Sequence, residues 1–278
     1  MKPFKAAIRA FALACIGLAS LSAARAEDIV VTHYGSLLYG VPYAIALEKG
    51  YFKEAGVDIT GILTSKGGGT SVRNMMAGDT LFAEVALPAA LSAIKEGFNI
   101  KIISGGTDGS SSFWVTRPGE KIEKPEDLKG KRFVFSRPKS VSESTILAVL
   151  KSHKIDPSEV KMVAIGDFGA GLTALEHNKV DIAIIPEPIY SAKEKAGVKY
   201  QIIPWLDEKL PDYTQTVGIA TDEAVAKKGD KLKAVIEARR RGVEFLYAHP
   251  KEAAAIVAKV YNLAPDVAAN AIANIIKM

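Results

Sequence analysis

The segment LKGKRFVFSRPKSVSES, residues 128–144, holds the pattern that decides how this chain folds. Phe133–Phe135 is a short apolar run that favours β-structure, and Lys129–Lys131 before it has the composition of a turn. The basic loop Ser136–Lys139 follows, and apolar residues then recur at helical spacing. The segment therefore predicts a buried strand, a polar loop and a helix, in that order.

The start of this predicted helix suits an anion. Ser140 and Glu143 have the spacing of a capping box. A helix start carries free backbone N–H groups and a partial positive charge, and Arg137 and Lys139 add charged donors there. The same pattern fits an ordinary capped helix in which Ser140 serves only the backbone, so the segment alone leaves both interpretations open.

Residues 1–26 have the pattern of a secretory signal peptide. A basic start precedes the apolar run Ala10–Leu21, which is too short for a permanent membrane anchor. Ala24-Arg25-Ala26 has the form of a cleavage site. We therefore expect cleavage before Glu27 and export to the periplasm.

The composition excludes several classes of function. Cys15 is the only cysteine and lies in the signal segment, so the mature chain would have no disulfide, catalytic thiol or cysteine-ligated metal. The signal segment carries four of the 36 Lys and Arg residues and no acidic residue. The mature chain would therefore have 32 basic and 31 acidic residues. No basic face for nucleic acid is implied. The histidines form no pair at metal spacing, so we expect no metal and no cofactor.

The mature chain alternates between predicted strands and helices. The expected strands are Ile29–His33, Val57–Thr64, Leu81–Ala86, Ile100–Ser104, Phe113–Thr116, Phe133–Phe135, Lys161–Ile165, Val180–Ile185 and Thr216–Ala220, and the helices between them include Pro42–Lys49, Thr70–Ala77 and Pro88–Glu96. Such alternation argues for parallel sheets with helices on both faces. In such sheets ligands bind at the carboxyl ends of the strands, and the loops there are polar or rich in glycine in this chain.

Two segments have the composition of a change of domain, Thr107–Ser112 and Pro204–Gln215. One domain interrupted by another needs two such crossings. After the second crossing the chain is purely helical, through Leu232–Tyr247, Pro250–Val260 and Pro265–Ile276. The run Arg239-Arg240-Arg241 in the first of these helices predicts a solvated basic face.

Three stretches match one known pattern in their order and spacing. They are EKGYFKEAGVDI at 48–59, LKGKRFVFS at 128–136 and ALEHNKVDIAIIPEP at 174–188. With them the chain resembles the periplasmic substrate-binding proteins of ABC-type importers. The branch that it resembles includes binders of nitrate, aliphatic sulfonates, taurine and thiamine pyrimidines, and the resemblance covers nearly all of the mature chain.

The resemblance implies a two-lobed α/β fold of the type II-like binding-protein kind. Two parallel or mixed sheets with flanking helices would be joined by a two-segment hinge, with the ligand between the lobes. Lobe 1 would hold residues 27–108 and 216–278, and lobe 2 residues 109–215. Ligand contacts would come from the loops after the strands. The matching positions in this chain are Tyr34, Ser36, Tyr39, Lys66, Gly67, Leu87, Ser136, Arg137, Ser140, Phe168 and Glu187.

Several of these positions also have purely structural interpretations. Tyr34 and Tyr39 could cover the edge of the first sheet, and Lys66 could be solvated. Glu187 lies between two prolines, and in the family this Glu-Pro pair is largely structural. The family often has a glycine where Lys139 precedes Ser140, so this lysine would either close the loop to a backbone contact or supply a charge. The chain also stops earlier than the family pattern suggests.

Two enzyme classes compete with a binding protein. Gly169–Ala174 fits the G-x-G-x-x-A motif of dinucleotide enzymes, with Glu187 near the position of a ribose-binding acid, but the motif alone is weak. A pyrimidine-synthesis enzyme shares the fold, but it would need a cysteine that the mature chain lacks.

The sequence therefore predicts a non-enzymatic, monomeric periplasmic carrier of a small-molecule ligand. It would deliver this ligand to an ABC permease at the inner membrane. The first choice of ligand is a small anion of the sulfonate, taurine, nitrate or carboxylate type, because of Arg137, Lys66 and the helix starts. The alternative is a heterocycle of the pyrimidine or thiamine-precursor type, stacked on Tyr34, Tyr39 or Phe168 with Glu187 as its partner.

Overall fold

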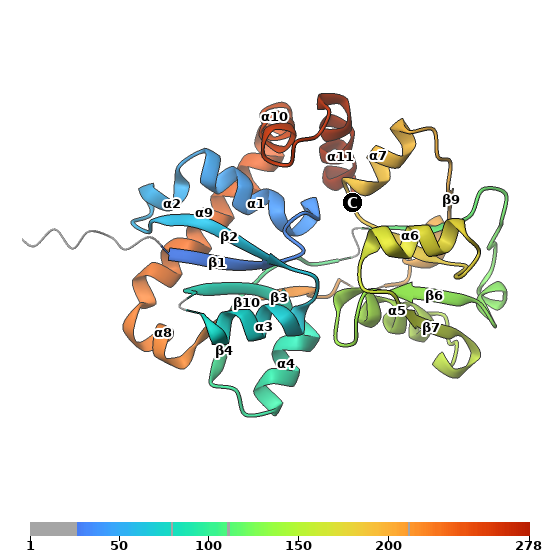
Figure 1. Cartoon of the computed structure of the whole chain (residues 1–278), viewed down its shortest axis with the longest axis horizontal. Helices are drawn as coiled ribbons and strands as arrows, with labels where there is room; N and C mark the ends of the chain where they lie inside the picture. Colours follow the sequence, from blue (N-terminus) through green and yellow to red (C-terminus); the bar gives the residue numbers. More distant parts are fainter. Residues whose placement is uncertain (1–26, 79, 110–111, 211) are drawn as a thin grey trace, which may run out of the picture.

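The computed structural model describes residues 27–78, 80–109, 112–210 and 212–278, apart from the side chain of Leu38. These residues form two α/β lobes side by side, with the C-terminal helices beside their junction (Figure 1). The expected signal segment, residues 1–26, lies outside the described residues.

The first lobe is built on a five-stranded sheet in the order β2-β1-β3-β10-β4. Its strands are β1 (Glu27–Thr32), β2 (Ile59–Ser65), β3 (Phe82–Ala86), β4 (Ile100–Gly105) and β10 (Thr216–Thr221). β1 is parallel to β2 and β3, whereas β10 is antiparallel to β3 and β4. The chain thus returns from the second lobe to complete the sheet with which it began.

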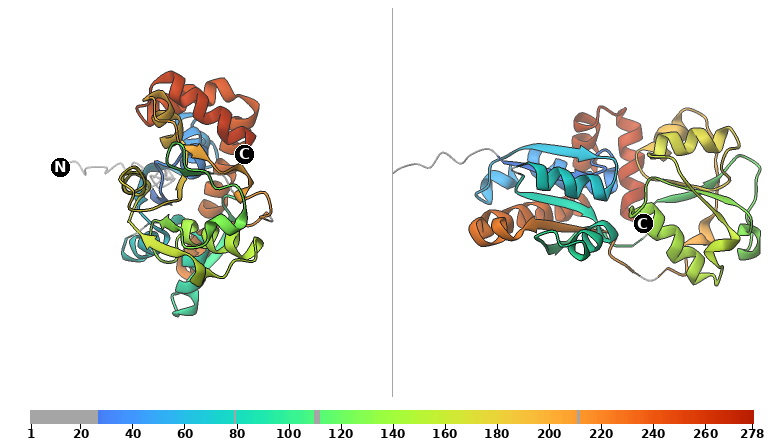
Figure 2. Two further views of the ribbon diagram at one scale, coloured as in Figure 1. Left: turned by 90° about the vertical axis from the view of Figure 1, so that its right-hand side faces the viewer. Right: turned by 60° about the horizontal axis from the view of Figure 1, so that its bottom comes forward.

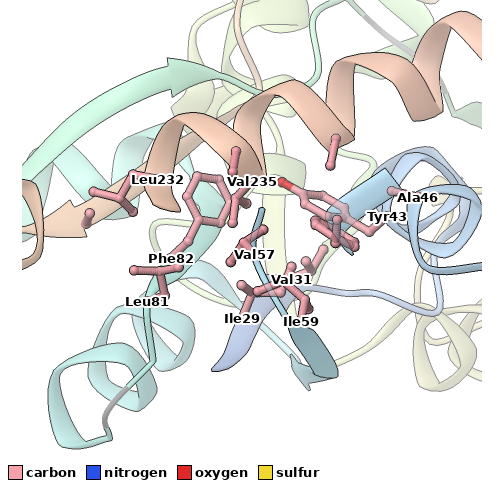
Figure 3. Packing of buried hydrophobic residues seen from close by; sticks show 14 of the residues in the cluster. Ile29, Val31, Tyr43, Ala46, Val57, Ile59, Leu81, Phe82, Leu232 and Val235 are labelled. Atoms are coloured by element: carbon pink, nitrogen blue, oxygen red, sulfur yellow. The ribbon is translucent and has the colours of Figure 1, made fainter. Parts of the chain in front are cut away.

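Helices cover both faces of this sheet because the side chains of each strand alternate between them. Ile29 and Val31 face α1 (Leu37–Glu48) and α9 (Gly229–Ala248), and Figure 3 shows this packing around Tyr43 and Phe82. The intervening Val30 packs on the other face. That face is covered by α3 (Gly68–Ala77) and α4 (Leu87–Lys95).

Helix α1 begins at Leu37, five residues before the predicted start at Pro42. Proline favours the first turn of a helix because it lacks a backbone N–H, and here it lies inside the helix. Burial on two sides offsets the missing bond. Tyr43 and Ala46 join the core against the sheet, while Leu37, Val41 and Ile45 join a second core against the C-terminal helices.

The second lobe has a smaller sheet system. β5 (Phe113–Thr116) pairs antiparallel with β8 (Ala183–Ile185) and β9 (Gln201–Ile202), and β6 (Arg132–Phe135) pairs parallel with β7 (Lys161–Ala164). A single parallel bridge from Phe133 to Ile182 joins the two sets of strands. Helices α5 (Val141–Ser152) and α6 (Phe168–Glu176) contribute to two separate cores of this lobe.

The other elements complete the two lobes. They are α2 (Tyr51–Glu54), α7 (Ile189–Lys195), α8 (Asp222–Lys227), α10 (Pro250–Val260), α11 (Pro265–Lys277) and short 3₁₀ turns at Pro125–Leu128, Pro157–Glu159 and Pro204–Leu206. Helix α11 packs both on α10 and on α7 of the second lobe. Figure 2 shows the C-terminal helices along the junction of the lobes.

The predicted two-lobed α/β architecture with flanking helices is confirmed. Most predicted elements lie within two residues of their observed bounds. The sequence differs from the structure at Val180–Ile182, where no continuous strand forms and only Ile182 makes a bridge. The described strands form three hydrogen-bonded sheets rather than the predicted two. The second lobe accounts for the difference, because its β6–β7 pair meets the β8-β5-β9 sheet through that single bridge. The exact lobe boundaries at 108 and 216 stay predictions. Within the described ranges, no helix is long and apolar enough to cross a membrane.

The predicted solvated basic face of α9 is only partly correct. Arg240 pairs with Glu237 and Glu244 at the surface, but Arg239 turns inward. Its Nε donates to the Glu84 carboxylate at 2.8 Å, and the Glu84 side chain is 1% exposed.

Glu84 also accepts hydrogen bonds from Tyr43 Oη at 2.6 Å and from Thr216 Oγ1 at 2.7 Å. This buried charge is thus compensated by donors from three elements, α1, β10 and α9.

Breaking this buried pair should destabilise the protein far more than breaking a surface pair. We expect Arg239→Ala to lower the free energy of unfolding by about 3–5 kcal/mol, because it leaves the Glu84 carboxylate buried without its counter-charge. The matched control on the same helix is Arg240→Ala, which should cost less than about 1 kcal/mol. Urea denaturation measures both, and similar losses in the two variants would contradict a buried, structural role for Arg239.

Glu187 links the second lobe to both α1 and α11. Its backbone carbonyl accepts from Leu37 N at 2.9 Å, at the start of α1. Its carboxylate, 1% exposed, accepts from Asn274 Nδ2 on α11 at 2.6 Å and from the Ser191 backbone and hydroxyl. Burial raises the pKa of Glu187 above its ordinary value of 4.5.

An acid whose pKa is higher in the folded state stabilises the fold when it is protonated, and it loses this stabilisation as the pH rises through the raised pKa. Glu187→Gln carries no charge, so its stability relative to the wild type should increase from acidic to neutral pH. Urea denaturation over a pH series measures this difference, with Glu208→Gln at an exposed position as the control. Parallel pH profiles of the wild type and Glu187→Gln would show that the shift is absent.

Candidate functional site

The loop after β2 is held by a chain of buried hydroxyl groups. Ser71 Oγ lies 2.5 Å from both Thr32 Oγ1 and Ser65 Oγ, and Ser65 Oγ donates to the Gly67 carbonyl at 3.2 Å. These bonds join the ends of β1 and β2 to α3, so the turn Gly67–Gly69 has a fixed position. Sequence reasoning found Lys66 and Gly67 but not the serines that hold them.

Gly68 permits this turn to lie close to the next loop. A Cβ atom on Gly68 would lie 2.7 Å from Ala89 Cβ and 2.8 Å from Ala86 Cβ, so a larger residue would push α3 away from α4. The first turn of α3 therefore packs directly against the end of β3.

The loop after β6 is held by hydroxyl groups as well. Ser140 is the N-cap of α5, and its Oγ accepts from Glu143 N at 3.2 Å. Ser142 Oγ accepts from Ser136 N at 3.0 Å and lies 3.1 Å from Ser136 Oγ and 3.0 Å from Ser140 Oγ. Ser136 and Ser140 are thus brought together, but by Ser142, which the sequence interpretation had not identified.

Lys139 takes the left-handed backbone conformation that glycine usually supplies, with φ of 63°. Its backbone N–H donates to Glu143 Oε2 at 2.6 Å, which stabilises the turn. Its ammonium group reaches across to the first lobe, where Nζ lies 2.8 Å from Glu96 Oε1. The lysine therefore supplies a charge, and that charge is neutralised by a carboxylate of the facing lobe.

Two other contacts join the lobes on this side. Lys66 Nζ lies 3.1 Å from Asp167 Oδ2, and the rings of His33 and Phe168 are 5.2 Å apart. Three predicted site residues thus lie at the junction. Lys66 and Gly67 of the first lobe face the second lobe, and Phe168 of the second lobe faces the first.

A pocket of about 470 Å³ lies between the lobes at this place. Its walls come from α3 and α4 on one side and from the loop after β6 on the other. The lining residues are Gly67, Gly68, Gly69, Thr70, Val72, Arg73, Ala89, Ser92, Ala93, Glu96, Phe98, Arg137, Pro138 and Lys139. Of the predicted ligand residues, Gly67 and Arg137 line this pocket.

Arg137 extends from the second lobe over the glycine turn of the first. Its Cδ atom is 3.2 Å from the position of a Cβ on Gly67. Among the described residues, no carboxylate pairs with its guanidinium group, and Glu143 is engaged by Lys139 N instead. The Arg137 side chain, which lines the pocket, therefore carries a positive charge that no acid among the described residues balances.

The aromatic and hydroxyl residues after β1 are not among the residues that line this pocket. The rings of Tyr34 and Tyr261 are 5.4 Å apart. Ser36 is the N-cap of α1, but its Oγ makes no capping bond and has no partner among the described residues, although it is buried. A buried hydroxyl without a partner is unfavourable, so Ser36 is available to a bound group.

Tyr39 and Leu87 lie beside the crossing segments instead. Tyr39 Oη donates to Gln215 Oε1 at 2.9 Å, and Leu87 N donates to the Gln215 carbonyl at 2.9 Å. These two residues are thus tied to the second crossing. Glu187 is likewise occupied by Asn274 and Ser191.

The glycine motif at 169–174 does not form an open phosphate site. It lies in α6, whose N-cap residue Asp167 accepts from Ala170 N at 2.9 Å and pairs with Lys66. A carboxylate therefore occupies the helix start where a pyrophosphate would bind. In the described part of the chain, no group of three or more His, Cys, Asp or Glu residues could hold a metal ion.

Comparison with known proteins agrees with this architecture. The chain is 26% identical over 231 residues to a Bacillus subtilis (strain 168) protein named "Putative binding protein YtlA", covering 78% of this chain and 68% of that protein.

Two crystal structures are similar in fold. The aliphatic sulphonate binding protein SsuA of Escherichia coli has a TM-score of 0.71 at 16% identity, over 90% of this chain and 83% of SsuA. The nitrate-binding protein NrtA of Synechocystis PCC 6803 has a TM-score of 0.66 at 14% identity, over 87% of this chain and 68% of NrtA.

A family model described as NMT1/THI5 like matches residues 39–253, which includes the greater part of both lobes and the crossings between them. The predicted resemblance to nitrate- and sulfonate-binding proteins is thereby confirmed at the level of the fold. The chain belongs to the NMT1/THI5-like family.

Proposed function

We propose that this protein is the solute-binding component of an ABC-type importer. It captures a small organic or inorganic anion between its lobes and delivers it to a membrane permease, without catalysing a reaction. The observation that carries the proposal is Arg137, which lines an interlobe pocket and has no carboxylate partner among the described residues.

The electrostatics of the junction favour an anion. Burial, followed by the nearby charge of Arg137, lowers the pKa of His33 to about 4, so this imidazole is neutral at pH 7. Lys66 and Lys139 are each paired with one carboxylate of the facing lobe. Arg137 therefore adds an unbalanced positive charge, which a bound anion would neutralise.

The site residues divide by their contacts into proposed roles. Gly67 and Arg137 would contact the ligand, since both line the pocket. Ser36 lies outside this lining, and its unused buried hydroxyl group is a separate candidate contact. Lys66 and Phe168 would close the pocket by contacts across the junction. Ser136 and Ser140 would hold the loop of Arg137, and Tyr34 lies outside the pocket lining.

Two alternatives have less support. A neutral or cationic heterocycle would take Glu187 as its partner, but the Glu187 carboxylate already accepts from Asn274 and Ser191. A dinucleotide enzyme would need an open helix start at 169–174, which Asp167 occupies.

Transport would depend on movement of the lobes. A ligand that touches both lobes binds the closed form better, so it shifts the protein toward closure. The crossings near residues 108 and 216 would act as the hinge, and the closed face would be read by the permease. The signal pattern at 1–26 supports a periplasmic location for the mature monomer.

Removing the charge of Arg137 should weaken anion binding. A thermal-shift panel of sulfonates, nitrate, aromatic carboxylates and pyrimidines identifies the ligand, because a molecule that binds only the folded state raises its stability. We then expect Arg137→Ala to lower the affinity about ten- to a hundredfold, and Arg137→Lys to lower it less, because lysine cannot make two parallel bonds to one anionic group.

Isothermal titration measures these affinities, with Arg240→Ala as a surface control that should bind like the wild type. Wild-type affinity in Arg137→Ala, or a panel in which only uncharged pyrimidines bind, would reject the anion proposal.

Closure should be visible in solution. We expect the radius of gyration from small-angle X-ray scattering to decrease when a saturating anion is added to the ligand-free protein. The physical reason is that, without a ligand, exposed ion pairs such as Lys66–Asp167 hold the lobes together, and each such pair contributes little to stability. A radius that is the same with and without saturating anion would argue against a hinged clamp.

A further inference from the structure

The pocket between the lobes contains a second arginine that the sequence interpretation did not select. Arg73 lies on α3 of the first lobe, and its Nη1 atom is 3.8 Å from the position of a Cβ on Gly69. Arg137 lies against Gly67 at the other end of the same glycine turn. The aliphatic part of the Arg137 side chain thus lies at one end of the turn and the Arg73 guanidinium group at the other, one from each lobe, and both residues line the pocket.

Neither arginine has an acid partner in the part of the chain that the structure describes. Among the described residues, Arg73 makes one hydrogen bond, from Nη2 to Thr70 Oγ1 at 3.3 Å, and has no ion pair. Arg137 has none with a carboxylate either. The two lysines nearby differ in this respect, since Lys66 pairs with Asp167 and Lys139 with Glu96. The pocket lining thus carries two positive charges in excess of its one acid–lysine pair.

The size of the pocket is greater than an inorganic anion requires. A water molecule occupies about 30 Å³ in the liquid, so a pocket of about 470 Å³ would hold on the order of fifteen waters. Volumes of about 300–1,000 Å³ are typical of sites for organic ligands.

The lining between the charged groups is partly apolar, with Val72, Ala89, Ala93, Phe98 and Pro138. These side chains could cover a carbon skeleton, whereas nitrate or sulfate would leave them in contact with water.

From these observations we infer that the ligand is an organic dianion, a carbon skeleton that carries two acidic groups such as carboxylate or sulfonate. This inference rests on the proposed function and specifies its ligand. One acidic group binds Arg137 of the second lobe, and the other binds Arg73 of the first. The ligand then bridges the lobes through its two charges, and a monoanion of the same skeleton can satisfy only one arginine.

Matched pairs of ligands test the inference directly. Isothermal titration compares propane-1-sulfonate with 3-sulfopropanoate, pentanoate with glutarate, and benzoate with terephthalate, at low and at high salt. We expect the dianion of at least one pair to bind about ten- to a hundredfold more tightly than its monoanion, the range of one charge-assisted hydrogen bond. This preference should decrease at high salt, because salt screens partly exposed charges.

Variants assign the second charge to Arg73. Arg73→Gln should abolish the preference for the dianion and leave the monoanion affinity unchanged, whereas Arg137→Gln should weaken both. Arg73→Lys keeps a positive charge and should retain part of the preference. Arg73 is exposed on α3, so the fold should survive, and equal melting temperatures of the ligand-free variants check this. Arg240→Gln is the control for loss of an arginine elsewhere.

The outcomes separate the inference from the proposed function. Monoanions that bind as tightly as their dianions, with affinity still dependent on Arg137, would overturn the inference and leave the anion-carrier proposal intact. Equal losses of monoanion and dianion affinity in Arg73→Gln would also overturn it. Binding of none of these anions would overturn the inference, and the anion-carrier proposal would fall with it only if the thermal-shift panel, nitrate included, also finds no anion that binds.

Discussion

The geometry of the junction depends on the hydrogen bonds between the two segments that cross from one lobe to the other. The Thr107 carbonyl accepts from Gln215 N at 2.7 Å and from Thr216 N at 3.3 Å, and Thr107 N donates to Thr216 Oγ1 at 2.8 Å. Gln215 extends this junction to the lobes through Tyr39 and Leu87. Because Thr216 also donates to buried Glu84, the crossing is anchored in the core of the first lobe.

The anchored junction places charged residues of the two lobes opposite one another. Of the four cations on the side of the pocket, Lys66 and Lys139 are balanced by acids of the facing lobe. Arg73 and Arg137 have no such partner among the described residues and lie on either side of one glycine turn. Surface ion pairs contribute little to stability by themselves, so the lysines hold the lobes together only weakly. A ligand that neutralises the arginines adds the larger, charge-assisted contribution.

The sequence predicted the fold well because its signals are local. The continuous apolar run of β1 and the capping serine of α5 act within a few residues, and the strand and the cap appear in the structure as predicted. The start of α1 was misplaced because burial on two sides overrides the preference of Pro42 for a helix end. Arg239 was predicted to be solvated rather than buried, because its partner Glu84 is 155 residues away in the chain and no local pattern indicates the pair.

The candidate site was predictable only in part for the same reason. Arg137 and Gly67 could be selected because each follows a strand directly. Arg73 lies one turn inside a helix, where an arginine normally suggests a solvated face, and only the approach of the second lobe places it in a pocket. Ser142 and Gln215 act through other residues, and no local pattern distinguishes them from ordinary polar positions. Lys139 shows this limit most clearly. Its sequence marked a departure from the family pattern, which often has glycine there, but only the structure shows that Glu96 is its partner.

The central claim is that an anion binds between the glycine turn of the first lobe and Arg137 of the second. A crystal structure of the mature protein with the anion that raises its melting temperature most tests this directly. The account predicts electron density for the anion in the interlobe pocket, with an acidic group in contact with Arg137 and with the Gly67–Gly69 turn. Density outside this pocket, or an anion that touches only one lobe, would contradict it.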